Sequence, residues 1–228
     1  TEQFAVARAP NYNGEDGFAY GIHLNGNVKN IDTSIVALNA RQPDPVYLLQ
    51  GLASDGRVQL QEEFARYSMA GLGVAIDPGH SLVVRSELAY FRQWQFINLL
   101  SETGVSENDM VKGLIGLDYL WRDWLLSMQW WRQQIINWQP GTSQQQKDDL
   151  FTISAEGSQF QDRLNSRLVL AASPGVEDGF AQGIFKYRPN DTIRFGFQID
   201  IYFGKQEMLF GAYDKHDNVQ LSFDYLFN

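Results

Sequence analysis

The fold is decided by two stretches near the end of the chain: residues 193–203 read IRFGFQIDIYF, and residues 219–227 read VQLSFDYLF. In both, every second residue is apolar or aromatic, and the residues between are mostly polar or charged. Successive side chains of a β-strand point to opposite faces, so a period of two predicts strands with one apolar and one polar face. The predicted fold class is therefore all-β.

The same alternation recurs along the whole chain and predicts about twelve strands. A helical period fits less well everywhere, and the only stretches that allow a short helix, both within loops, are residues 59–67 and 96–101. The predicted strands are residues 3–9, 18–28, 31–39, 67–76, 82–90, 111–121, 124–138, 149–156, 164–172, 179–187, 193–203 and 219–227.

The connections between these strands alternate in length. Turn-forming residues such as Asp77-Pro78-Gly79 favour tight reversals of the chain. Tight turns are expected at residues 29–30, 77–80, 122–123, 158–162 and 188–191, longer links at 40–63, 92–109, 139–148 and 204–217, and a shorter link at 173–178. This alternation predicts an up-and-down antiparallel meander with two unlike ends, in which residues 1–228 form a single domain or the C-terminal portion of one.

Composition excludes several classes of protein. The chain has 228 residues, with 27 Asp and Glu against 18 Lys and Arg, and no Cys. The acidic balance argues against nucleic acid as a partner, because such proteins need a basic surface for phosphates. Without Cys there is no disulfide, thiol nucleophile or thiolate-bound zinc. The longest apolar run, residues 70–76, is far shorter than the ~20 residues that a membrane-spanning helix needs.

Two architectures share this pattern: a soluble barrel or sandwich with its apolar face inside, and a transmembrane barrel with that face toward lipid. The predicted strands match the roughly 9–11 residues that cross a bilayer. Their polar faces carry ionisable groups, which suit a water-filled interior. The predicted pore-lining residues are Arg85, Glu87, Lys112, Asp118, Arg167, Lys186, Arg194, Asp200 and Asp224.

Aromatic residues favour the membrane barrel. The chain holds 15 Phe, 10 Tyr and 6 Trp although its mean hydropathy is −0.31. Aromatic side chains collect near strand ends, as in the two girdles of outer-membrane barrels, where rings lie at the headgroup level. The predicted girdle near the tight turns is Trp121, Trp124, Tyr187, Tyr225 and Phe227, and the one near the long links is Tyr20, Tyr90, Trp94, Trp138 and Phe203.

The end of the chain also resembles a known family. The last strand, with Phe227 before the final Asn228, is similar to the terminal strand by which outer-membrane barrels are recognised for assembly, although the aromatic residue is ordinarily last. Residues 180–227, with the turn at 187–191, residues 199–204 and residues 217–219, resemble the proteobacterial outer-membrane family labelled domain of unknown function 1302. Residues 3–9 and 13–18 share this resemblance. Members of that family are longer, so the chain resembles either their C-terminal part or a relative closed at twelve strands.

This resemblance implies a protein of the bacterial outer membrane that transports or exports hydrophobic or small organic compounds. The expected partners are the lipid bilayer with its lipopolysaccharide, the barrel-assembly machinery, and periplasmic or inner-membrane transport proteins. The resemblance transfers no catalytic residue. The leading hypothesis is thus a channel, a passive conduit that is not an enzyme and needs no cofactor.

Candidate catalytic and metal-binding residues are sparse. His23, His80 and His216 are not at ligand spacing, so no metal site is expected. A hydrolase would need a nucleophile beside a histidine, and only His23 with Ser34 or Asp32 offers such a set. The run 71–73 (Gly-Leu-Gly) lacks the lysine and helix of a phosphate loop. An outer-membrane hydrolase is therefore the weaker enzymatic alternative.

The predicted polar wall carries both signs of charge, which predicts weak ion selectivity. Trp131, Tyr202, Tyr67 and Met69 fall in the same phase. They would form either a path for apolar solutes or a surface that packs against a plug. A further alternative is a soluble β-sandwich that binds carbohydrate on its aromatic residues; it predicts solubility without detergent and aromatic rings grouped in one groove.

Overall fold

The computed structural model describes residues 4–9 and 17–227 and consists almost entirely of β-strands. A short 3-10 turn, η2 (Gly211–Tyr213), interrupts the last connection. The strands are β1 (Phe4–Ala7), β2 (Tyr20–Val28), β3 (Ile31–Arg41), β4 (Val46–Leu52), β5 (Val58–Glu63), β6 (Arg66–Gly79), β7 (Leu82–Ile97), β8 (Val105–Trp121), β9 (Trp124–Ile136), β10 (Lys147–Gln159), β11 (Leu164–Ser173), β12 (Asp178–Tyr187), β13 (Ile193–Phe203) and β14 (Asn218–Tyr225).

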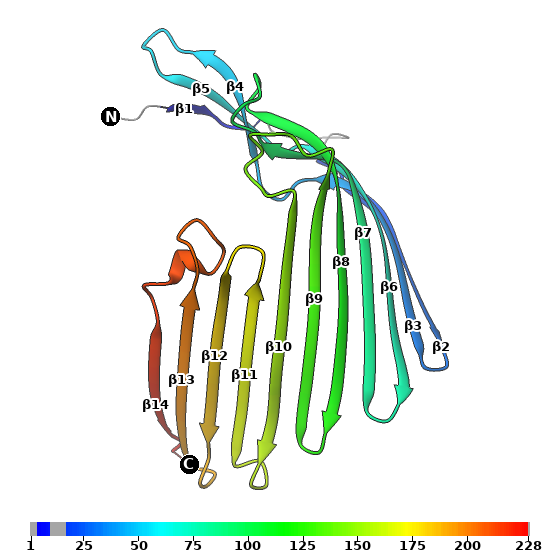
Figure 1. The fold of residues 1–228 in the computed structure, drawn as a ribbon, viewed down its shortest axis with the longest axis vertical. Helices are drawn as coiled ribbons and strands as arrows, with labels where there is room; N and C mark the ends of the chain where they lie inside the picture. The colour runs from blue at the N-terminus through cyan, green and yellow to red at the C-terminus, as the bar shows by residue number, and fades with distance from the viewer. Residues whose placement is uncertain (1–3, 10–16, 228) are drawn as a thin grey trace.

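Eleven of these strands form one large sheet in the order β14-β13-β12-β11-β10-β9-β8-β7-β6-β3-β2 (Figure 1). Every neighbouring pair in it is antiparallel. The turns that follow β2, β6, β8, β10 and β12 lie at one end of this sheet, together with the C-terminus. We call this the turn end, and the opposite end, where the longer connections lie, the loop end. The prediction of an all-β fold with a large antiparallel meander is confirmed.

The large sheet is open along the described residues. Strands β2 and β14 pair on one side only, and they lie at opposite sides of the sheet in Figure 1. A sheet of twelve strands closed on itself is therefore not formed by the described strands. Because eleven antiparallel strands are an odd number, the two edge strands run in the same direction, toward the turn end.

The N-terminal strand and the link at residues 40–63 differ from the sequence-based expectation. Residues 40–63 contain the hairpin β4–β5, and β1 pairs with β5 in parallel, so these three strands form a separate sheet at the loop end (Figure 1). The helix predicted at residues 59–67 is wrong, because this segment belongs to β5 and β6. Gly51, with φ 122°, lies in a bulge of β4, and this break in register obscures the alternation.

The link predicted at residues 92–109 is also mostly strand. Strand β7 continues to Ile97 and β8 begins at Val105, so the helix predicted at residues 96–101 is wrong. The register of β7 shifts between Phe91 and Trp94, and Gln93 has φ 61°. A bulge inserts one residue and moves the following side chains to the other phase. The period of two is therefore lost in the sequence although the strand continues.

Protein contacts bury little apolar surface in this fold. Three buried side chains, Phe96, Met110 and Ile135, form a small cluster on β7, β8 and β9 near the loop end. The other buried apolar residues of the described chain are Ala40, Val46, Ala65 and Ala171. A soluble domain of this size buries about 70% of the surface that its unfolded chain exposes, around a core of large side chains. The large sheet has no such core.

Candidate functional site

The two faces of the large sheet differ in chemistry along all eleven strands. Directly opposed residues of an antiparallel pair lie on the same face, so the register carries the face of Phe197 from strand to strand as far as Leu24. We call this the apolar face. Exposed large apolar side chains occupy it on every strand, namely Leu24, Ile35, Leu72, Leu88, Ile115, Met128, Ile153, Leu170, Tyr187, Phe197 and Leu221.

The opposite, polar face collects the charged residues that the sequence singled out. The register places Arg85, Glu87, Lys112, Asp118, Arg167, Lys186, Arg194, Asp200 and Asp224 together on it. Tyr67, Met69, Trp131 and Tyr202 share this face, as their phase predicts. That these residues line a pore stays a prediction.

Most of the predicted girdle residues lie on the apolar face. These are Tyr20, Tyr90, Trp121, Trp124, Tyr187, Phe203 and Tyr225. Phe227 follows the end of β14, is 88% exposed, and contacts the ring of Tyr225 edge-on. Trp130, which the prediction missed, lies on the apolar face in phase with Met128 and stacks on Phe151.

Trp94 and Trp138 do not share that face. The bulge at Gln93 places Trp94 opposite Asn108, on the polar face, where it packs against the buried cluster of Phe96, Met110 and Ile135. Trp138 follows β9, packs against the same cluster, and donates a hydrogen bond from Nε1 to the carbonyl oxygen of Gln144 at 2.9 Å. Neither ring therefore lies in the predicted aromatic girdle, because both pack against the buried cluster at the loop end.

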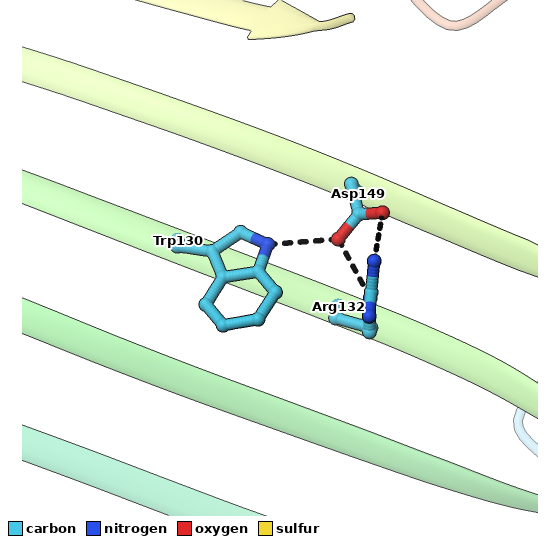
Figure 2. Close-up of polar contacts among 3 residues, drawn as sticks. All are labelled: Trp130, Arg132 and Asp149. Atoms are coloured by element: carbon cyan, nitrogen blue, oxygen red, sulfur yellow. Dashed lines mark hydrogen bonds and ion pairs between the residues drawn. The ribbon is translucent and has the colours of Figure 1, made fainter. Parts of the chain in front are cut away.

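Near the loop end the apolar face acquires a charged group, shown in Figure 2. Arg132 donates from Nε and Nη2 to the two carboxylate oxygens of Asp149, at 2.8 and 2.7 Å. The indole Nε1 of Trp130 donates to the same carboxylate at 2.7 Å. On the neighbouring pair of strands, the Tyr90 hydroxyl donates to Asp109. Charged side chains thus mark where the apolar part of this face ends.

The polar face near the turn end is hydrophilic. Arg85 Nη2 lies 2.6 Å from Asp118 Oδ2, and Ser127 donates to the same carboxylate at 2.6 Å. Arg85 thus forms an ion pair across the β7–β8 strand pair with Asp118. A hollow of about 460 Å³ opens beside it, lined mostly by polar side chains and glycine, among them Asn25, Asp32, Ser34, Arg85 and Glu87.

Toward the loop end the same face becomes aromatic. The rings of Tyr67, Phe91 and Trp94 contact one another, with centroids 4.8 Å apart for Tyr67 and Trp94 and 5.5 Å apart for Phe91 and Trp94. The Lys112 ammonium lies 5.3 Å from the Phe91 centroid and 5.8 Å from the Trp94 centroid. Cation–π attraction at such distances holds an ammonium over the ring faces.

A second hollow, of about 410 Å³, lies between the hydrophilic and aromatic parts of this face. It is lined by Ser34, Val36, Met69, Gly71, Gly73, Glu87, Ala89, Phe91, Lys112, Leu114 and Trp131, with parts of Leu72, Leu88 and Gly113. Ser34, Gly73 and Glu87 also line the first hollow, so the two adjoin. We call it the Lys112 hollow.

The polar face of β11 to β14 is organised differently, because two of its acids are buried and accept hydrogen bonds from within the chain. The buried Asp200 accepts hydrogen bonds from Gln182 and Gln198, both at 2.7 Å. The buried Asp178 accepts from the backbone N–H groups of Phe210 and Gly211, at 3.1 and 2.7 Å. The β13–β14 connection is thereby fixed at the loop end.

Rings complete this attachment. Phe180 of the polar face stacks on Phe210, with centroids 6.0 Å apart, and lies 4.9 Å from the ring centroid of Tyr202. Tyr202 in turn contacts Tyr213 of η2. Sequence reasoning found Asp200 but missed Asp178, because the only signal was a carboxylate at a strand start, and its backbone partners lie more than thirty residues away.

The histidines do not form a catalytic set. His23 lies on the polar face opposite Val36, while Ser34 and Asp32 oppose Asn25 and Asn27. His216 contacts the ring of Tyr213, and His80 lies in the turn between β6 and β7. Among residues 4–9 and 17–227, no cluster of three His, Cys, Asp or Glu side chains could hold a metal ion. No helix in this part of the chain is both long and apolar enough to cross a membrane.

No protein-family model matches this chain, and no curated protein matches it. The resemblance drawn from residues 180–227 therefore stays a prediction.

Proposed function

We propose that this chain forms the wall of an outer-membrane β-barrel that acts as a passive conduit for small or hydrophobic compounds in envelope export. The observation that carries the proposal is the segregation of the two faces over eleven strands, with the apolar face covered by no residue of 4–9 and 17–227. Exposed apolar surface on this scale costs free energy in water, roughly 25 cal/mol per Å². Contact with lipid removes that cost.

The dimensions of the sheet support the same proposal. Strands β6 to β13 are 10–17 residues long, and a tilted strand needs roughly 9–11 residues to cross the hydrocarbon layer. Aromatic residues of the apolar face lie at both ends, among them Trp121 and Trp124 at the turn end and Tyr90 and Trp130 toward the loop end. The polar face then borders an aqueous interior of mixed charge, for which weak ion selectivity is expected.

In this proposal the barrel closes with further strands. Strands β2 and β14 run in the same direction, so an all-antiparallel closure requires an odd number of strands between them. Bacterial outer-membrane barrels have even numbers of antiparallel strands, which an odd addition to eleven satisfies. Direct pairing of β2 with β14, or of β14 with β2 of a second copy, would be parallel.

The two alternatives receive less support. A soluble sandwich needs a second layer over the apolar face, and none of the described strands covers it. A hydrolase centred on His23 needs an adjacent nucleophile, and the register places Val36 opposite this residue.

Electrophoresis of the detergent-extracted protein, with and without heating, tests the proposal. Folded outer-membrane barrels resist the detergent until they are heated, so the unheated protein should migrate differently from the heated one. Migration that is independent of heating, together with a monodisperse protein in detergent-free buffer, would contradict the proposal.

A further inference from the structure

We propose that the Lys112 hollow is a binding site for monoanionic aromatic or aliphatic solutes, with the anionic head at Lys112 and the apolar body along Met69 and the ring of Phe91. This inference rests on the proposed function, because solutes reach this face only if it borders an aqueous path. It adds a solute class and a site to a conduit that is otherwise unspecific.

The first observation that supports an anion site is the environment of the Lys112 ammonium. This ammonium is partly buried over two rings, and no ion pair to it occurs among residues 4–9 and 17–227. Two arginines of the same face, by contrast, have an acidic neighbour: Arg85 pairs with Asp118, and Arg194 lies opposite Asp224. A partly buried charge without a counterion loses hydration, and an incoming anion compensates for that loss.

The second observation is the space that small residues leave beside Lys112. Gly71 and Ala89 are directly opposed on the polar face, and Ala89 in turn opposes Lys112. All three positions line the depression of about 410 Å³, and the two small residues leave its floor open beside the ammonium. A Cβ added at Gly71 would lie 2.9 Å from Val36 Cγ1, so the wall tolerates no side chain there without rearrangement.

The third observation is that apolar and acidic residues lie on opposite sides of Lys112 along the polar face. On the loop side of Lys112 the face presents Met69, Phe91 and Trp94, which are apolar and aromatic. On the turn side, Glu87 lies one cross-strand pair away, opposite Leu114. A solute with an apolar body and one negative charge matches the loop side, whereas Glu87 repels a second negative charge.

The test measures binding of three probes to the protein in vesicles of zwitterionic phosphatidylcholine, which carry no net charge. Binding is measured by equilibrium dialysis against protein-free vesicles. The probes are 1-naphthoate, the uncharged 1-naphthamide and the dianion naphthalene-1,4-dicarboxylate. We expect 1-naphthoate to bind at least about tenfold more tightly than either, because a charge-assisted contact to an ammonium discriminates by roughly this factor. Equal affinities for 1-naphthoate and 1-naphthamide would overturn the site.

Variants locate the site. Lys112→Met should remove the preference for 1-naphthoate over 1-naphthamide, while Lys186→Met, a lysine of the same face near the turn end, should leave it unchanged. Phe91→Leu, which replaces the aromatic side chain that lines the hollow, should weaken 1-naphthoate and 1-naphthamide alike. An equal loss in Lys112→Met and Lys186→Met would contradict the inference, because it indicates attraction to the general charge of the wall.

The heat-dependent gel shift of each vesicle sample separates the two levels of failure. If the shift is present but charge discrimination is absent, the Lys112 site fails and the proposed barrel stands. If neither the native protein nor its variants insert and shift, the proposed function fails and the site fails with it.

Discussion

The two faces of the large sheet are built by the same strands, yet they differ in how their side chains are satisfied. On the polar face, Asp118, Asp178 and Asp200 all find donors within the chain. On the apolar face, side chains such as Leu88 and Leu221 are 56% and 79% exposed. Exposed apolar side chains on one face and polar side chains on the other are what the proposed barrel requires, with lipid on the first side and water on the second.

The largest expected effect comes from a charge on the apolar face. Leu168 and Val169 are adjacent in β11, but Leu168 lies on the apolar face and Val169 on the polar face. Leu168→Arg should reduce the free energy of unfolding in phosphatidylcholine vesicles by about 2–4 kcal/mol, as expected for a cation near the bilayer midplane. Val169→Arg should change it by less than about 1 kcal/mol. Urea unfolding followed by tryptophan fluorescence measures both, and equal effects would remove the distinction between the faces.

The attachment of the β13–β14 connection ranks next. Asp178→Ala leaves the buried N–H of Gly211 without its acceptor, which costs about 1–3 kcal/mol. Hydrogen exchange at Phe210 and Gly211 should accelerate accordingly, whereas Asp191→Ala, in the exposed turn before β13, should leave it unchanged. Asp178→Asn keeps an acceptor oxygen and should restore part of the protection. Unchanged exchange in Asp178→Ala would show that this loop is held by other contacts.

Filling each of the two hollows of the polar face in turn should show that only the Lys112 hollow binds the probes. Ala89→Leu places a larger side chain between Gly71 and Lys112 and should weaken 1-naphthoate and 1-naphthamide alike, on the order of tenfold. Ala75→Leu makes the same change in the hydrophilic hollow near the turn end and should leave both affinities unchanged. A loss of affinity only in Ala75→Leu would place binding in the hydrophilic hollow near the turn end and would contradict the Lys112 site.

The smallest effect is expected for the Arg85–Asp118 pair. Arg85 is 40% exposed, so solvent screens the interaction and the coupling should be below about 1 kcal/mol. A double-mutant cycle with Arg85→Gln and Asp118→Asn, measured by urea unfolding, gives this coupling. A value well above that limit would mean that water does not reach this part of the polar face.

The sequence predicts those strands best whose alternation is unbroken. The bounds of β13, Ile193–Phe203, agree with the prediction, because six large apolar residues alternate there with polar ones and glycine. At Trp94 the prediction of the face is wrong, because the bulge at Gln93 adds one residue to the period. The sequence predicts a link in place of the hairpin β4–β5. Both strands are short, and the bulge at Gly51 breaks the alternation along β4.

The candidate site was predicted only in part. Alternation assigns Lys112, Glu87 and Met69 to one face, because a face depends on local periodicity alone. It gives no information on neighbours across strands, since these depend on register. The approach of Lys112 to Phe91 and Trp94, and the depression over Gly71 and Ala89, therefore appear only once β6, β7 and β8 are aligned.

The central claim is that the apolar face meets lipid and the polar face meets water. The chain has no Cys, so a single cysteine placed at position 167, 168, 169 or 170 is the only thiol available for a nitroxide spin label. In vesicles, labels at 168 and 170 should collide preferentially with oxygen, and labels at 167 and 169 with a water-soluble nickel chelate. Accessibility that lacks this period of two, or that reverses it, would contradict the account.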